Sequence, residues 1–529
     1  MERNYTEAFA DEVVQVCVAK YKSLKKTGKP KTGGEWTLLS CFVQEEWTNN
    51  TPKDSNTFKG SNTLKVVALG TGSKCIGAQQ LPRDGDVLHD SHAEVVARRA
   101  FVLYLIQQVR SAADGQTSIF QVKNGTFVLK PDVFFHFYTS HTPCGDASIF
   151  PKQEWLESVG NALKMEDKDA PCATILPSRE GKHLHRSGEV METREAYRSA
   201  TPKGQHLHGL CREAESGSDT EVPTKKRKFE DVGNTMKNEN KQTKEEGTNN
   251  DKDNNITEER ASNGIRILSD TFRTGAKCVS GETPDPRLPG SEYHVTGVLR
   301  TKPGRGDPTL SMSCSDKMFK WTVLGVQGAL LMLLLDKPVY VNTVVIGQCP
   351  YSQEAMSRAI FGRFQKKIES LKLPEGFSVH TPVLLQSCVE FPHSRSYVSS
   401  NVPDGCKLMP TPTSIVWTDT SLHTESQEVV TNGRRLGCTK KNIGTSKSWV
   451  SICRRVISNK VLDLVKDSVL KLEDLSHVSY NNLKCHSESY LQAWSSVRVA
   501  CLPNWTEKTK HLKDFKIMYS KPAVQGASL

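Results

Sequence analysis

Asp90-Ser91-His92-Ala93-Glu94 is the stretch around which the rest of this chain can be interpreted. A histidine is followed two residues later by a glutamate, and the apolar positions that begin at Val95 predict a helix. Positions two apart do not share a helix face, so His92 and Glu94 can converge only where that helix begins. Ser91 fits an N-cap at this point. The spacing Ser91-x-x-Glu94 also fits a capping box, in which Glu94 would only bind backbone N–H groups.

Two cysteines complete a candidate metal site with His92. Cys144 follows Pro143 just after an apolar run, 133–139, that predicts a buried strand, and a helix beginning there would favour its thiolate. Cys314 lies within Ser311-Met312-Ser313-Cys314-Ser315. One imidazole and two thiolates would leave the fourth position of a tetrahedral zinc ion open for water, as in catalytic zinc sites. The alternative for each cysteine is a small buried thiol.

The chemistry of such a site requires a carboxylate beside the metal. Zinc lowers the pKa of bound water from 15.7 to about 7, and Glu94 could then take and return its proton. A His-x-Glu followed by a Pro-Cys is the signature of zinc-dependent base deaminases, which usually continue as Cys-x-x-Cys. Here Ala147 occupies the position three after Cys144, so the second thiolate must come from elsewhere. Cys314, 170 residues later (314 minus 144), is the candidate.

Three motifs together resemble those of the adenosine-to-inosine RNA deaminases. They are Ser91-His92-Ala93-Glu94, Pro143-Cys144-Gly145-Asp146-Ala147 and Ser313-Cys314-Ser315-Asp316-Lys317. The resemblance runs from about Trp36 to Lys508, with one insert. It implies zinc-dependent hydrolytic deamination of adenosine, with His92, Cys144 and Cys314 as ligands and Glu94 as proton carrier. It also implies an α/β fold, a three-layer cytidine-deaminase-like core in which a mixed sheet is flanked by helices.

The same resemblance implies a buried inositol hexakisphosphate. The positions that match its binding residues are Lys74, Arg98, Arg99, Lys302, Lys317, Lys320, Trp321, Lys447, Tyr480, Lys484, Tyr490, Trp505 and Lys508. The sequence departs from the family pattern at His89, Lys320 and Ala329, where the family has Asn, Arg and Ser. A lysine at 320 keeps the charge but loses bidentate phosphate geometry. From the residues alone, the alternative is a set of surface salt bridges and RNA-facing charges.

Composition divides the 529 residues into four parts. A helix over 6–24 and a basic loop occupy 1–35, and 36–163 hold the first half of the deaminase core. Residues 164–288 are polar and poor in aromatics, which predicts a disordered insert, and 289–529 return to the core and end in a mostly helical region. Within the insert, Lys225-Lys226-Arg227-Lys228 fits a nuclear import signal or simply solvated charge.

Charge and cysteine content limit the class of protein. The net charge of +11 and the pI of about 8.9 favour a polyanionic partner. Fifteen irregularly spaced cysteines do not indicate a disulfide framework, and no signal peptide is seen, so we expect the nucleus or cytoplasm and not secretion. The densest apolar run, 329–335, is too short to cross a bilayer, and no obligate protein partner is evident.

The expected substrate is a small structured RNA. No double-stranded-RNA-binding module is seen before Trp36, and a base in a loop costs less to extrude than one in a duplex. The resemblance implies tRNA, with position 37 of alanine tRNA as the target, and gives Asp307 the place of an acidic residue that fills the gap left by a flipped base. The alternatives are editing of duplex RNA, or a catalytically silent RNA-binding protein with structural zinc.

Overall fold

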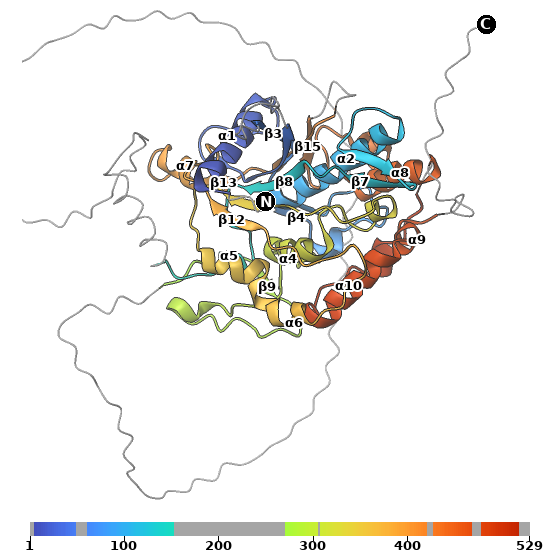
Figure 1. Cartoon of the computed structure of the whole chain (residues 1–529). Coiled ribbons are helices and arrows are strands. Elements are labelled where there is room, and N and C mark those ends of the chain that lie inside the picture. The colour runs from blue at the N-terminus through green and yellow to red at the C-terminus, as the bar shows by residue number, and fades with distance from the viewer. Residues whose placement is uncertain are drawn as a thin grey trace, which may run out of the picture. The chain divides into compact units, whose positions relative to one another are not determined.

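A mixed β-sheet forms the centre of the computed structural model, which describes residues 5–48, 61–152, 270–304, 307–420, 427–467 and 478–517 (Figure 1). Its strand order is β12-β11-β8-β2-β3-β14-β15-β16. The first three strands run parallel, and every later pair is antiparallel. Their bounds are β2 Leu39–Thr48, β3 Ser61–Thr71, β8 Val133–Thr139, β11 Thr343–Ile346, β12 Val383–Gln386, β14 Thr413–Thr418, β15 Gln427–Thr431 and β16 Arg434–Arg435.

Helices cover both faces of this sheet because successive strand residues point to opposite sides. In β2, Phe42 faces α2 (Ala93–Ala113) and stacks on Phe101 with ring centroids 4.2 Å apart. Cys41 and Val43 face the other way and pack in one buried cluster with α1 (Glu7–Ser23). The predicted mixed sheet flanked by helices is therefore confirmed, as is the N-terminal helix expected over 6–24.

The remaining helices and short strands surround this core. The helices are α4 Cys314–Leu324, α5 Gln353–Ile360, α6 Gln365–Glu369, α7 Arg395–Ser400, α8 Arg454–Asp467, α9 Tyr480–Cys485 and α10 Glu488–Cys501. The short strand pairs are β1 Glu35–Trp36 with β13 Met409–Pro410, β4 Ser73–Cys75 with β5 Asp90–His92, β6 Phe120–Lys123 with β7 Thr126–Leu129, and β9 Lys277–Cys278 with β10 Arg300–Thr301. Among the described residues, no helix combines the length and apolarity that a membrane span requires.

The polar insert expected over 164–288 is described only from residue 270 onward, and Lys225–Lys228 lies outside the described residues. The hydroxyl of Thr271 donates to the carbonyl of Phe150 (2.8 Å). Asp285 forms two hydrogen bonds, of 2.8 and 2.5 Å, with the fully buried guanidinium of Arg300. Residues 270–288 thus pack against the segments on both sides of the expected insert. The four domain boundaries themselves stay a prediction.

The stacked pair Phe42–Phe101 gives a direct test of the core. We expect Phe101→Ala to lower the free energy of unfolding by about 3–5 kcal/mol, because a fully buried ring is lost and a cavity remains. Urea denaturation followed by circular dichroism would measure it. Val122→Ala, on the exposed β6–β7 hairpin, is the control and should change stability by less than about 0.5 kcal/mol. Equal losses in the two variants would contradict the assigned packing.

Candidate active site

Side chains from three distant segments meet at one point. His92 ends β5, Cys144 follows β8, and Cys314 begins α4. His92 Nδ1 lies 3.9 Å from Cys144 Sγ and 3.8 Å from Cys314 Sγ. All three ligand atoms lie within 4.8 Å of one another. One tetrahedral ion with bonds of about 2.0–2.3 Å to nitrogen and sulfur could contact all three.

A glycine allows the two cysteine segments to approach. Gly145 has φ of +105°, and a Cβ atom there would lie 2.3 Å from Ser313 Oγ. The amide of Cys314 donates to Cys144 Sγ at 3.4 Å, so this sulfur lies at the N-terminus of α4. The helix expected directly after Cys144 is wrong: Asp146–Ser148 form a 3-10 turn, and Ile149 after it is extended. The helix start beside the sulfur belongs to α4.

The surroundings of Cys144 Sγ favour negative charge, whereas burial and the neighbouring Cys144 raise the pKa of the Cys314 thiol well above its usual range. A hydrogen bond with Cys314 holds the pKa of the Cys144 thiol well below its usual range; burial opposes this, and the charges of Lys302 and His92 add to it. Lys302, fully buried, donates to Cys314 Sγ at 3.0 Å and to Asp90 Oδ1 at 3.1 Å. One imidazole nitrogen and two cysteine sulfurs form a donor set that zinc prefers.

Glu94 is buried in the first turn of α2, with 3% of its surface exposed. The capping-box alternative is wrong, because Ser91 lies in β5 and the N-cap is His92, which makes no side-chain cap bond. Glu94 Oε2 is buried, yet no group in the described part of the chain forms a hydrogen bond with it. Burial is the largest influence on two neighbouring groups: it raises the pKa of Cys314 and lowers the pKa of His141. The negative charge of Glu94 acts on both groups and raises both pKa values. Glu94 therefore lies beside the cluster and is free to exchange protons.

A second group of possible ligands, Cys75, Asp90 and His92, shares the histidine. Both oxygens of Asp90 already accept hydrogen bonds, from Lys302 and from Lys317 Nζ at 2.5 Å. Because its carboxylate is neutralised by two ammonium groups, Asp90 is a weaker metal ligand than the thiols. The geometry favours His92, Cys144 and Cys314.

A cavity of about 350 Å³ lies beyond Asp90. Its wall is rich in cations, and the only carboxylates in it are Asp90 and Glu507. The cations are Arg98, Arg99, Lys317, Lys320, Arg454, Lys484, Lys508 and Lys513. Of these, only Lys317 and Lys513 form an ion pair with a carboxylate of the described residues. The cavity is built for negative charge that the described residues themselves do not supply.

The cations of the cavity lower one another's pKa values. Burial and the neighbouring charge of Lys484 hold the pKa of Lys320 well below its usual range. Burial and Arg454 do the same for Lys508. Burial together with Arg454 lowers the pKa of Arg99 to about 10. An anion in the cavity would relieve all three shifts.

His89 behaves as a neutral member of the same wall. Burial and the charge of Lys508 lower its pKa to about 2, so its Nδ1 accepts from Lys508 Nζ at 2.8 Å. Its buried Nε2 then carries the proton, for which the described residues offer no acceptor. This N–H is a further donor for an anion.

Ten of the thirteen positions expected to bind inositol hexakisphosphate line this cavity: Arg98, Arg99, Lys317, Lys320, Trp321, Tyr480, Lys484, Tyr490, Trp505 and Lys508. Lys302 does not line the cavity but donates a hydrogen bond to Asp90, which does. Lys74 lies in β4 opposite Ser91, and Lys447 is exposed in a 3-10 turn. Sequence reasoning missed Arg454, Lys513 and Trp494. They lie in basic or helical stretches with no motif, so only the tertiary fold identifies them.

Asp307 is held against the turn after β4. Its Oδ2 accepts the amide of Gln79 at 2.9 Å, and the missing Cβ of Gly77 leaves room for its carboxylate. The carbonyl of Pro308 accepts from the amide of Ala78 at 2.8 Å. The carboxylate therefore already has a partner in this turn, and its expected contact with RNA stays a prediction.

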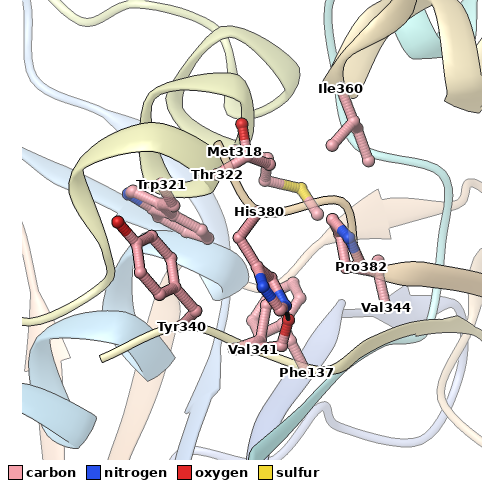
Figure 2. A pocket seen from close by; sticks show the side chains of 10 residues that line it. All are labelled: Phe137, Met318, Trp321, Thr322, Tyr340, Val341, Val344, Ile360, His380 and Pro382. Atoms are coloured by element: carbon pink, nitrogen blue, oxygen red, sulfur yellow. Dashed lines mark hydrogen bonds between the residues drawn. The ribbon is translucent and has the colours of Figure 1, made fainter. Parts of the chain in front are cut away.

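A small apolar cavity lies on another side of Trp321 (Figure 2). Its volume is about 10 Å³, and the rings of Tyr340 and His380, which face one another in Figure 2, stack beside it at 5.2 Å. Space of this size is near the lower limit for one water molecule, so it is a packing gap and not a substrate site.

Known proteins resemble this chain along nearly its whole length. The family model for the adenosine-deaminase (editase) domain matches residues 68–509. The "tRNA-specific adenosine deaminase 1" of Mus musculus is 38% identical over 96% of this chain and 99% of its own, and that of Homo sapiens is 35% identical over the same shares. The "Double-stranded RNA-specific editase Adar" of Drosophila melanogaster is 28% identical over 59% of this chain and 31% of its own. The chain belongs to the adenosine-deaminase (editase) domain family.

Proposed function

We propose that this protein is an enzyme that converts adenosine to inosine in tRNA by hydrolysis, releasing ammonia. The observation that carries the proposal is the buried, partner-free oxygen of Glu94 beside His92, Cys144 and Cys314. Relatives that match over nearly their full length bear tRNA in their names, whereas the duplex-RNA editase of Drosophila melanogaster matches over less than a third of its own. Because the tRNA-specific relatives match along almost their whole length, tRNA is favoured over duplex RNA as the substrate.

We propose zinc as the metal, held by His92 Nδ1, Cys144 Sγ and Cys314 Sγ within a cytidine-deaminase-like core. The donor set fits a three-ligand catalytic zinc site. When bound, zinc would supply a Lewis acid that lowers the pKa of a coordinated water to about 7. Lys302, donating to Cys314 Sγ, offsets part of the negative charge of the two thiolates.

Glu94 would move the protons of the reaction. Its Oε2 would take a proton from the attacking water and deliver it to N1 of the adenine as C6 becomes tetrahedral. A second proton, from the hydroxyl group now on C6, would pass to the exocyclic nitrogen, which leaves C6 as ammonia while the C6 carbonyl of inosine forms. Burial suits this role, because it keeps bulk water away from the carboxylate and the reacting base.

We further propose that the cationic cavity holds inositol hexakisphosphate. Six of its eight cations have no carboxylate partner among the described residues, and burial of unpaired charge is expensive. A polyanion of this size would supply phosphate oxygens to several cations at once. The alternative, a set of surface salt bridges, is disfavoured because the wall holds two carboxylates for eight cations.

The finer features of the substrate and location rest on the resemblance. We propose position 37 of alanine tRNA as the target and the nucleus or cytoplasm as the location. Thirteen described cysteines are free, which fits a reducing compartment. The remaining alternative is a silent RNA-binding protein with structural zinc, and intact Glu94 argues against it.

Metal content tests the choice between the two ligand groups. We expect Cys144→Ser and Cys314→Ser to lose the bound zinc, because each removes one of three ligands. Cys75→Ser, the matched control, should retain it. Elemental analysis of the purified proteins would measure zinc per chain. Loss of zinc from Cys75→Ser with retention in Cys314→Ser would assign the site to the other group.

The role of Glu94 is tested by Glu94→Gln. Without a carboxylate to move protons, deamination should slow by about 10²–10⁴-fold, while zinc content and tRNA affinity stay the same. Sequencing of inosine in transcribed alanine tRNA after incubation would measure it, with the exposed Glu292→Gln as control. Wild-type protein that binds tRNA but forms no inosine would support the silent alternative. Conversion by Glu94→Gln at the wild-type rate would remove Glu94 from the mechanism.

The sign of a stability change tests the polyanion. In an empty cavity, Lys320→Met would relieve repulsion and stabilise the fold. Around a bound polyanion it should destabilise the fold by roughly 1.5–3 kcal/mol, because a charge-assisted contact is lost. We expect the second result by thermal unfolding, together with inositol phosphate in the acid extract of the wild-type protein. Lys366→Met, exposed on α6, is the control and should have no effect.

A further inference from the structure

The loop between β8 and Cys144 uses almost all its polar side chains to hold itself in place. Thr139 Oγ1 accepts from Ser40 Oγ at 3.0 Å, and Ser140 Oγ accepts from the amide of Leu39 at 3.0 Å. Thr142 Oγ1 donates to the carbonyl of Pro350 at 2.6 Å. His141 differs from these residues. Its ring nitrogen Nδ1 is bonded, but its Nε2 has no partner among the described residues.

The hydrogen bond of His141 fixes the character of that nitrogen. Its Nδ1 lies 3.2 Å from the carbonyl oxygen of Thr142. A carbonyl only accepts, so Nδ1 carries the proton. Burial lowers the pKa of the ring, which is therefore neutral near pH 7. Nε2 then presents a lone pair and can only accept a hydrogen bond.

The position of His141 places this acceptor beside the candidate reaction centre. It lies three residues before Cys144 and is partly exposed. The charged groups whose fields reach its ring are Glu94 on α2, Arg395 at the start of α7, and Cys144. Under the proposed function, adenine binds with N1 near Glu94 and with C6 near the metal that Cys144 would help to hold. The exocyclic amine attached to C6 must then lie close to the same side chains.

We propose that His141 is a substrate-positioning residue whose Nε2 accepts a hydrogen bond from the exocyclic amine of the target adenine. This inference rests on the proposed adenosine deamination. It has a consequence for the product: inosine carries a carbonyl oxygen at C6, and two acceptors facing each other repel. The same nitrogen that orients the substrate therefore disfavours retention of the product.

The amine contact can be isolated by comparing two RNAs in a background that does not turn over. Glu94→Gln and Glu94→Gln/His141→Ala would each bind a tRNA carrying adenosine, and one carrying purine riboside, which lacks the amine, at the target position. We expect His141→Ala to weaken binding of the adenosine tRNA by about 5–10-fold, as for one lost hydrogen bond. Binding of the purine-riboside tRNA should change by less than about 2-fold, because no contact is lost.

Matched variants separate positioning from structure. His141→Gln restores an acceptor oxygen and should recover part of the adenosine-specific affinity, and His511→Ala, an exposed histidine, should affect neither RNA. Equal weakening of both RNAs, or of neither, would overturn the proposal. Failure of the wild-type enzyme to convert adenosine would instead overturn the proposed function. Zinc content equal to that of the parent shows that the metal cluster is intact in each variant.

Discussion

The carboxylate of Asp90 is the constraint on which both halves of the site depend. It is 5% exposed and accepts from the ammonium groups of Lys302 and Lys317. Burying one of these charges alone would be costly, so the three are stable only as a set. Lys302 also donates to Cys314 Sγ, and Lys317 also lines the cationic cavity. One carboxylate thus connects the candidate metal cluster with the candidate polyanion site.

Several helices of the protein meet around the cationic cavity, where an apolar core would be usual. The wall joins α2 and α4 to the C-terminal helices α8, α9 and α10, and it does so mainly through cations. Such a wall repels itself unless an anion is present, so docking of the C-terminal region and anion binding are linked. The family resemblance supplied the identity of most of these residues, but the physical reason for an anion is visible only from their shared burial.

The sequence was sufficient for elements whose patterns are local. The sequence predicted a helix over 6–24, and α1 forms there with Val13 and Cys17 buried on its inner face. It failed where tertiary contacts decide. Ser91 looked like an N-cap, yet its backbone pairs with Lys74 in a strand. A helix was expected after Cys144. The positive φ of Gly145 instead turns the backbone out of the helical conformation, and the missing side chain lets Gly145 pack closely against Ser313.

The three motifs contain three buried carboxylates of two different kinds. Asp146 accepts from Arg358 and from the amide of Gly297, and Asp316 accepts from Arg363 and Ser313. Both are fully used in fixing the loops that carry the cysteines. Of these three, Glu94 alone keeps a buried oxygen that no described residue satisfies. A buried acceptor left unsatisfied costs about 1–3 kcal/mol, and it persists in a well-paired site when a bound molecule completes it. The pattern of satisfied and unsatisfied oxygens therefore separates the carboxylates that build this site from the one that reacts in it.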